Sequence, residues 1–225
     1  MPLPSNIKNL SAVGSDEVGV GDYLAPLVVT CAYVEEAQIP KLHELGVKDS
    51  KNLSDARICK IADAIKTKLP HKTVIFENKH YNAMIAQGLN AHVVKSFLHN
   101  FALTELTNRL ATYPEYIIVD EFASKENHFK YLRQLPKKPA ILQKHLHFVK
   151  KGESAHIAVA AASILARHAF IDSVDNLSKR LEMEVLKGAS AKVDACARQI
   201  AKKHGEAVLK DVCKFHFANT KRVFQ

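Results

Sequence analysis

The sequence is poor in cysteine, and its four cysteines are scattered along the chain without a close pair. They are Cys31, Cys59, Cys196 and Cys213. This distribution indicates neither a disulfide framework nor a metal site, and we expect reduced thiols that are mostly buried. The twelve histidines also lack the pairing that is typical of zinc sites. His145 and His147 share one face of an expected strand, but no cysteine lies near them in the sequence.

Other features that would assign the chain to a special class are also missing. No apolar run is expected to span a bilayer, and the stretch MPLPSNIKNLSAVG lacks the basic and then apolar layout of a signal peptide. Internal repeats, low-complexity segments and linkers are lacking as well. The sequence therefore predicts a cytoplasmic monomer that does not contact a membrane. We expect one domain over residues 1–225, with C-terminal helices from about residue 175 packed on it.

Positive charge is in excess, with a formal net charge of +9 and a pI near 9.3. The basic side chains gather in LPKKPAILQKHLHFVKKGE and in ARQIAKKHGEAVLKDVCKFHFANTKR. A basic globular protein without a membrane signal suggests a polyanionic partner, most often nucleic acid. Charge alone also suits a surface that only keeps the protein soluble.

Hydrophobic spacing predicts strands and helices that alternate along the chain. Strands are expected over 10–18, 24–34 and 72–77 and in YIIVDEFAS and LHFVKKGES. Helices are expected over 54–69, 79–87 and 91–111, in the alanine-rich AHIAVAAASILARHAFIDSVDNL, and at least twice in the C-terminal third. Gly19 and Gly21 favour a tight antiparallel hairpin between the first two strands, because glycine readily adopts a positive φ. The order indicates an α/β fold with a central mixed β-sheet, flanked by helices, and a helical C-terminal region.

Acidic side chains stand at the ends of several expected strands. Asp16 and Glu17 end the first strand, Asp120 ends the fourth, and Glu153 follows the fifth at the start of a helix. Sites in open α/β sheets form where strand ends meet loops, so these segments can present their carboxylates at one edge. Crowded carboxylates repel one another and normally hold a hard divalent cation. Ligands that are all oxygen favour Mg²⁺ or Mn²⁺ over zinc.

Each of these acids also has a purely local explanation. Glu153 can stabilise a helix N-terminus through the helix dipole. Asp120 can cap the turn that follows it, and Asp16 can hydrogen-bond the glycine-rich loop. From the residues alone, the local and the metal-binding interpretations both remain open.

The stretch GSDEVGVGDYLAPLVV resembles the first signature of the type 2 ribonucleases H, in particular the ribonuclease HIII branch. The resemblance continues in the family's order through VKDSKNLSD, GLNAHVVKSFLHN, VDEFAS, GESAHIAVAAASILARHAF and KFHFANTKR, over nearly the whole chain. It implies a ribonuclease H-like fold and a metal-dependent endoribonuclease that cleaves the RNA strand of RNA–DNA hybrids. By motif, the catalytic and metal-binding residues would be Asp16, Glu17, Asp120 and Glu153.

Two positions indicate the branch within that family. Glutamate at 153 is similar to the HIII branch, where the HII branch has aspartate, and Gly19-Val20-Gly21 lacks the Gly-Arg-Gly of HII. The expected chemistry is hydrolysis with two Mg²⁺ or Mn²⁺ ions bridged by Asp16, which leaves 5′-phosphate and 3′-hydroxyl ends.

Substrate contacts are expected from glycine backbone and small polar groups that read the ribose 2′-hydroxyl, and from groups that contact phosphates. The expected substrate-binding residues are Gly19, Val20, Gly21, Lys48, Ser50, Lys51, Asn52 and Ser154. Arg167 is a weaker candidate, because a salt bridge within the fold explains it equally well.

Four positions depart from the pattern of the family. Val20 stands where threonine is usual, Ala25 where glycine is usual, Glu121 where glutamine is common and Lys150 where threonine is expected. These departures spare all four acids. They therefore bear on affinity and substrate preference more than on the chemical step.

Relatives generally carry a substrate-binding domain ahead of the catalytic one, whereas Asp16 lies fifteen residues after Met1. We therefore expect weaker hybrid binding, partly offset by the basic C-terminal helices. Two other functions remain open. One is an HII-like nuclease that cuts at single ribonucleotides embedded in DNA, which the missing arginine between the glycines disfavours. The other is a hybrid-binding protein without activity, which the intact acids disfavour.

Overall fold

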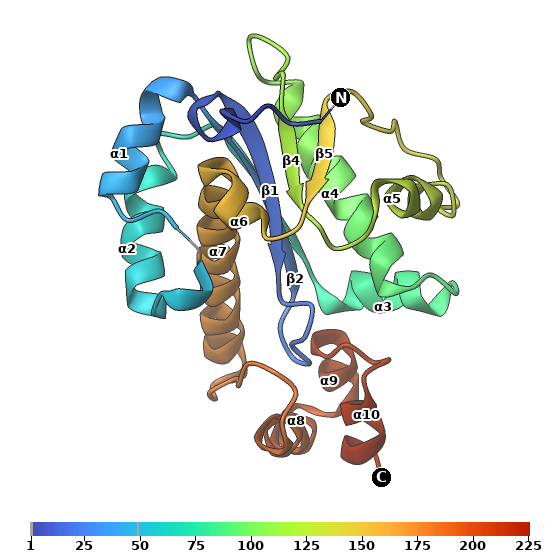
Figure 1. Ribbon diagram of the computed structural model, residues 1–225. Coiled ribbons are helices and arrows are strands. Elements are labelled where there is room, and N and C mark those ends of the chain that lie inside the picture. Colours follow the sequence, from blue (N-terminus) through green and yellow to red (C-terminus); the bar gives the residue numbers. More distant parts are fainter. Residues whose placement is uncertain (1, 49) are drawn as a thin grey trace. The chain divides into compact units, whose positions relative to one another are not determined.

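The computed structural model describes residues 2–48 and 50–225, and its sheet has the strand order β3-β2-β1-β4-β5 (Figure 1). Asp49, in the predicted motif VKDSKNLSD, lies outside the described residues. The strands are β1 (Ala12–Val18), β2 (Leu27–Val34), β3 (His71–Phe76), β4 (Ile117–Asp120) and β5 (Leu146–Val149). All five strands lie close to where the sequence predicts them.

The directions of the strands decide which ends meet. Strand β4 pairs in parallel with β1 on one side and with β5 on the other. Strands β1 and β2 are joined by residues 19–26 only, which is too short for the crossover that a parallel pair needs. The predicted mixed sheet is therefore confirmed, and the carboxyl ends of β1, β4 and β5 lie at one edge.

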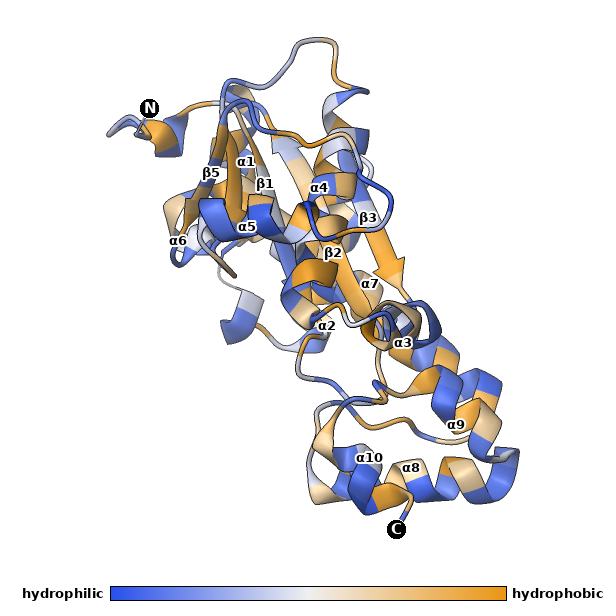
Figure 2. Cartoon of the chain, turned by 90° about the vertical axis from the view of Figure 1, so that its right-hand side faces the viewer, coloured by the Kyte–Doolittle hydropathy of each residue, from blue (hydrophilic) through white to orange (hydrophobic). Residues whose placement is uncertain are grey.

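Helices cover the sheet on both sides, and Figure 1 shows α2 and α7 on one side and α4 on the other. The helices are α1 (Ile39–Glu44), α2 (Asp55–Ile65), α3 (Asn78–Ala86), α4 (Ala91–Thr107), α5 (Lys125–Leu132), α6 (Gly152–Ala155), α7 (Ile157–Leu181), α8 (Ala191–His204), α9 (Glu206–Val212) and α10 (Ala218–Val223). Three 3₁₀ helices are η1 (Ile7–Asn9), η2 (Glu36–Gln38) and η3 (Ser50–Asn52). Figure 2 shows apolar strands beside helices that alternate between polar and apolar residues.

Local signals explain where several helices begin. Ser54 caps α2 as predicted, because its side chain accepts a hydrogen bond from the backbone N–H of Arg57 at 3.3 Å. Ser124 caps α5 in the same way through Asn127. The sequence predicted neither α5 nor α1, because both are short and lack a regular apolar stripe.

The alanine-rich segment forms α7, as the sequence predicted, and the short helix α6 precedes it. His156 is extended, with φ −151°, and separates α6 from α7. Its ring nitrogen Nδ1 accepts the backbone N–H of Ala158 at 3.0 Å, and this bond caps the start of α7. The break gives α6 its own orientation, which matters for Glu153.

Helix α7 corrects one expectation, because it is long and apolar enough to cross a membrane by length and composition. However, 67% of its most apolar window is buried inside the protein, as in the core helix of a soluble protein. Three of the four cysteines, Cys31, Cys196 and Cys213, are buried, as predicted.

The contacts divide the chain into two compact units. The first comprises 1–17, Val29–Val74 and Ala91–His168, and the second comprises Val18–Val28, Ile75–Asn90 and Ala169–Gln225. All four predicted catalytic acids belong to the first unit. The predicted glycine loop and the C-terminal helices α8, α9 and α10 belong to the second. A single domain therefore stays a prediction.

Close packing between β1 and the start of α7 depends on Gly14. A Cβ atom at this position would lie 2.1 Å from the backbone nitrogen of Val159 and 2.2 Å from the carbonyl carbon of Ala158. The obstacle is backbone and cannot rotate away. Glycine at 14 therefore lets α7 approach the strand that carries Asp16 and Glu17.

We predict that Gly14→Ala lowers the free energy of unfolding by about 1–3 kcal/mol, because the added methyl group overpacks this contact. Urea denaturation followed by circular dichroism measures the change. Gly21→Ala is the matched control, since a Cβ there meets no atom within 4 Å and the φ of Gly21 is not left-handed. Equal stability of the two variants would contradict the role assigned to Gly14.

Candidate active site

The register of the parallel strands places two of the predicted acids next to each other. Ser15 pairs with Val119, so the next residues along β1 and β4 are Asp16 and Asp120. Strand β5 continues through residues 150–151 into α6, which carries Glu153. The structure thus brings Asp16, Glu17, Asp120 and Glu153 to the same edge of the sheet.

Asp16 is the most buried of the four acids, with 6% of its surface exposed. Burial raises the pKa of its carboxyl well above the usual value, and the negative charges of Glu17, Asp120 and Glu153 raise it further. A hydrogen bond from Ser163 opposes this effect. The backbone N–H of Glu17 also donates to Asp16 Oδ1 at 2.8 Å and fixes the direction of the side chain.

Glu17 has the opposite electrostatic environment. Burial alone would raise the pKa of its carboxyl, but hydrogen bonds and positive charge from His99 and Lys95 lower it to about 2. Lys95 Nζ lies 3.1 Å from Oε1, and His99 Nε2 lies 3.0 Å from Oε2. Both oxygens of Glu17 therefore have a partner on α4.

The two partners of Glu17 are themselves held in place. His99 Nδ1 lies 2.8 Å from Ser15 Oγ, so the strand that carries Glu17 also orients the ring. Phe122 stacks on His99 with ring centroids 4.8 Å apart, and Lys95 Nζ lies 4.7 Å from the centroid of the Phe122 ring. These contacts fix one rotamer of Glu17.

Asp120 depends on a close backbone approach. The backbone N–H of Gly152 donates to its Oδ1 at 2.7 Å. A Cβ on Gly152 would lie 3.2 Å from both the Cα and the Oδ1 of Asp120, so a side chain there would crowd the carboxylate. Glycine at the first position of α6 therefore lets the helix approach β4.

Two serine hydroxyls hold Glu153. Both Ser163 and Ser50 donate to its Oε1, Ser50 at 3.2 Å, and the two hydroxyls lie 2.7 Å from each other. Arg167 supports this arrangement, because it donates to the carbonyl of Ser50 at 2.6 Å and pairs with Asp55 Oδ1 at 2.9 Å. Arg167 thus has the structural role that the sequence left open.

The predicted substrate-binding residues divide into buried and exposed groups. Ser50 is 5% exposed and points to Glu153, so its observed contact is with another site residue. Lys48, Lys51, Asn52 and Ser154 are exposed, as phosphate-contacting side chains must be.

The glycine loop, residues 19–26, is longer than the predicted tight hairpin, because β2 begins at Leu27. Gly19 has φ +91°, as the sequence predicted, and a Cβ on it would lie 2.1 Å from the carbonyl oxygen of Pro26. Gly21 does not have a positive φ and faces open space. The Val20 side chain is 38% exposed. Two of the three residues therefore leave an accessible surface.

Several residues of the site were not predicted from the sequence. Lys95, His99 and Ser163 contact the acids directly. Lys95 and His99 are four residues apart on α4, and both are buried on a helix whose apolar spacing is imperfect. Polar residues inside an expected apolar face are the signal that could have found them.

The four carboxylates suit a hard divalent cation as ligands, although their oxygens do not converge on one point. Within residues 2–48 and 50–225, no three His, Cys, Asp or Glu side chains converge as ligands of one ion. Each acid instead has partners from the chain. However, all the donors are oxygen, and the negative charge that raises the pKa of Asp16 is of the kind that a bound cation neutralises. The residues fit Mg²⁺ or Mn²⁺.

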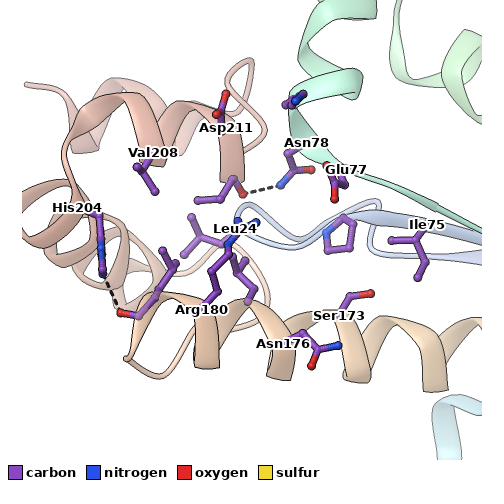
Figure 3. A pocket seen from close by; sticks show the side chains of 15 residues that line it. Leu24, Ile75, Glu77, Asn78, Ser173, Asn176, Arg180, His204, Val208 and Asp211 are labelled. Atoms are coloured by element: carbon purple, nitrogen blue, oxygen red, sulfur yellow. Dashed lines mark hydrogen bonds between the residues drawn. The ribbon is translucent and has the colours of Figure 1, made fainter.

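A separate cavity of about 670 Å³ lies in the second unit (Figure 3). It is lined by apolar side chains such as Leu24, Leu177 and Val208 and by a similar number of polar ones, among them Arg180 and Asn78. None of the described residues that line it is a predicted catalytic or substrate-binding residue. The acids, and not this cavity, therefore define the candidate site.

Comparisons with known proteins agree with this geometry. A family model described as Ribonuclease HII matches residues 13–220. The protein named Ribonuclease HIII from Bacillus mycoides (strain KBAB4) is 44% identical over 99% of this chain and 70% of its own length. The crystal structure of Bst-RNase HIII in complex with Mn²⁺ is 42% identical, with a TM-score of 0.91, over 96% of this chain and 70% of that chain. Ribonuclease H2 from Pyrococcus horikoshii OT3, 19% identical over 95% of this chain and 97% of that chain with a TM-score of 0.75, shares the fold.

We predict that Asp16→Asn raises the free energy of unfolding of the metal-free protein at neutral pH by about 1 kcal/mol. At neutral pH the folded protein either keeps Asp16 ionised in a buried position beside other acids or binds a proton there at a pH above the ordinary pKa of aspartate. Both alternatives cost free energy of folding, and the uncharged asparagine removes that cost. The measurement is chemical denaturation in a chelating buffer.

With added Mn²⁺, we expect the wild type to become more stable than Asp16→Asn. A ligand that binds only the folded state at a hundred times its dissociation constant stabilises by about 2.7 kcal/mol, and Asp16→Asn is expected to lose most of this gain. Asp63→Asn, at an exposed acid paired with Lys66, is the control. The same metal-induced stabilisation in wild type and Asp16→Asn would rule out Asp16 as a ligand.

Proposed function

We propose that this chain, which belongs to the ribonuclease HII family and is most similar in motif to ribonuclease HIII, hydrolyses the RNA strand of RNA–DNA hybrids. Membership of the family makes it a ribonuclease H. The observation that carries the proposal is the gathering of Asp16, Glu17, Asp120 and Glu153 at one sheet edge. The Mn²⁺ complex of a 42% identical relative supports divalent metal dependence.

Each of the four acids has a role in this proposal. Asp16, the most buried acid and the one next to Asp120 in register, would be shared by two divalent ions, and Glu17, Asp120 and Glu153 would complete their ligands. When bound, Mg²⁺ or Mn²⁺ supplies an activated water and stabilises the leaving 3′-oxygen, which gives 5′-phosphate and 3′-hydroxyl products.

The surrounding residues keep the acids oriented before the substrate arrives. Lys95 and His99 hold the two oxygens of Glu17 and compensate its charge. The Gly152 N–H holds Asp120, and Ser163 holds Glu153. Preformed orientation of this kind lowers the reorganisation needed during catalysis.

Recognition of RNA is proposed for the glycine loop and the exposed polar residues. Gly19, Val20 and Gly21 follow Glu17 after one residue, and Val20 and Gly21 are exposed, so that their backbone is suited to read a 2′-hydroxyl. Exposed Lys48 and Lys51 are suited to phosphates, so binding should weaken with salt. The monomeric state and the cytoplasmic location stay predictions.

We predict that the protein, with Mg²⁺ or Mn²⁺, cleaves a continuous hybrid and leaves an all-DNA duplex intact. The measurement uses end-labelled duplexes, including one with a single embedded ribonucleotide. Asp16→Asn should lower cleavage by at least about a thousandfold, because a bridging carboxylate is lost. Cleavage confined to the single ribonucleotide would support the HII-like alternative, and binding without cleavage in either metal would support the non-catalytic one.

We predict that Val20→Thr lowers the KM for the hybrid by about two- to tenfold, because an exposed hydroxyl adds one hydrogen bond of about 0.5–1.5 kcal/mol to sugar or phosphate. Steady-state kinetics measures the change. Val20→Ala is the control, since it removes the valine side chain without adding a hydroxyl. The same KM in wild type and in both variants would exclude Val20 from the substrate interface.

A further inference from the structure

Lys214, between α9 and α10, is a lysine with no exposed surface. Its ammonium group donates to the carbonyl oxygen of Asp22 at 2.6 Å and to that of Ala25. Its backbone N–H donates to the carbonyl of Tyr23 at 2.8 Å. Lys214 thus donates hydrogen bonds to three residues of the glycine loop (residues 19–26), namely Asp22, Tyr23 and Ala25.

A buried lysine is costly, and the fold keeps it nonetheless. Burial lowers the pKa of Lys214 to about 7, while Asp22 and Cys213 act in the opposite direction. The rings of Tyr81 and Phe217 flank the ammonium group, each with its centroid 5.9 Å from Nζ. An apolar side chain of similar length would fill the same space without that cost. What lysine adds is a set of directed hydrogen bonds to loop carbonyls.

Gly188 forms a second set of hydrogen bonds with the glycine loop. The backbone N–H of Gly188 donates to Asp22 Oδ1 at 2.5 Å, and the N–H of Tyr23 donates to the carbonyl of Gly188 at 2.9 Å. The Tyr23 hydroxyl also lies 3.1 Å from Thr220 Oγ1. Gly188 has φ +89°, a conformation that favours glycine.

The segment that carries Lys214 is fixed in turn by α3. Asn78 Nδ2 donates to the carbonyl of Val212 at 2.6 Å, the bond drawn as a dashed line at Asn78 in Figure 3. Asn82 Nδ2 donates to the carbonyl of Cys213 at 2.8 Å, and Asn82 Oδ1 accepts the N–H of Phe215 at 2.9 Å. Lys214 therefore sits on a rigid support.

We propose that Lys214 is a positioning residue for substrate selection, which fixes the backbone of the glycine loop so that residues 19–21 meet the ribose in one preformed orientation. The inference rests on the proposed contact between this loop and the hybrid. A loop that is already ordered loses less conformational entropy on binding, and a fixed backbone group discriminates more sharply than a mobile one. Lys214 acts through the loop and touches neither the substrate nor the acids.

The test compares Lys214→Met with Lys210→Met, a control at an exposed lysine on α9 that pairs with Glu206. Fluorescence anisotropy without divalent metal gives the dissociation constants for a hybrid and for a DNA duplex of the same sequence. The dissociation constant for DNA divided by that for the hybrid should fall about tenfold in Lys214→Met and stay unchanged in Lys210→Met. The KM for the hybrid should rise while kcat at saturating hybrid changes less than about threefold.

A purely stabilising role would lower the melting temperature of Lys214→Met and leave the hybrid-to-DNA ratio as in wild type, and that result would overturn the proposal. Should Lys214→Met not fold, Asn82→Ala loosens the same segment from a half-buried position, and an unchanged ratio in that variant overturns it equally. The wild-type measurement separates the two levels of inference. A wild type without preference for hybrids removes the proposed function itself, whereas a normal wild type with an unaffected Lys214 variant removes only the role of Lys214.

Discussion

Mutual repulsion of carboxylates is the constraint on which the site depends. Asp16 lies buried beside three other acids, and the fold must hold them there whether or not a cation is bound. The four acids have different hydrogen-bond and charge partners. Glu17 has two basic partners and a pKa of about 2, so its charge is secured. Asp120 accepts a backbone N–H and Glu153 accepts serine hydroxyls, whereas burial and the neighbouring acids make the ionised form of Asp16 unfavourable. The site therefore retains the negative charge that attracts a cation, while the basic partners keep one acid ionised and oriented.

Two close approaches allow these groups to meet, and both depend on glycine. At Gly14 the start of α7 lies against β1, and at Gly152 the start of α6 lies against Asp120. The parallel register of β1 and β4 then places Asp16 beside Asp120 without any long side chain. Because short carboxylates have few rotamers, backbone geometry more than side-chain freedom decides where their oxygens lie. The break at His156 contributes to this, since it lets α6 present Glu153 independently of α7.

Much of this arrangement can be predicted from the sequence. The apolar runs that end in Asp16 and Asp120 mark strands, and sites at strand ends follow from the chemistry of open sheets. The site residues that the sequence did not predict depend on contacts between segments that are distant in the chain. Lys95 and His99 belong to a helix whose polar positions look like imperfections of an apolar face until Glu17 is seen opposite them. The contact of Ser50 with Glu153 was not predicted either, because a one-dimensional motif does not say which way a small hydroxyl points.

The supports of the acids and of the glycine loop are separate, although Glu17 and Gly19 are only two residues apart in the chain. The contacts that orient the acids come from the first unit, and those that fix the loop come from the second. Under the proposed function, sequence change in the loop can therefore alter the selection of nucleic acid while the four acids stay in place. Ala25, where relatives usually have glycine, fits this view: the group that Lys214 uses is its carbonyl, which any residue supplies. Val20 differs, since its side chain is exposed and its chemistry is available to a substrate. Of the two departures within the loop, the one at position 20 is therefore the one for which the proposed function expects a change of specificity.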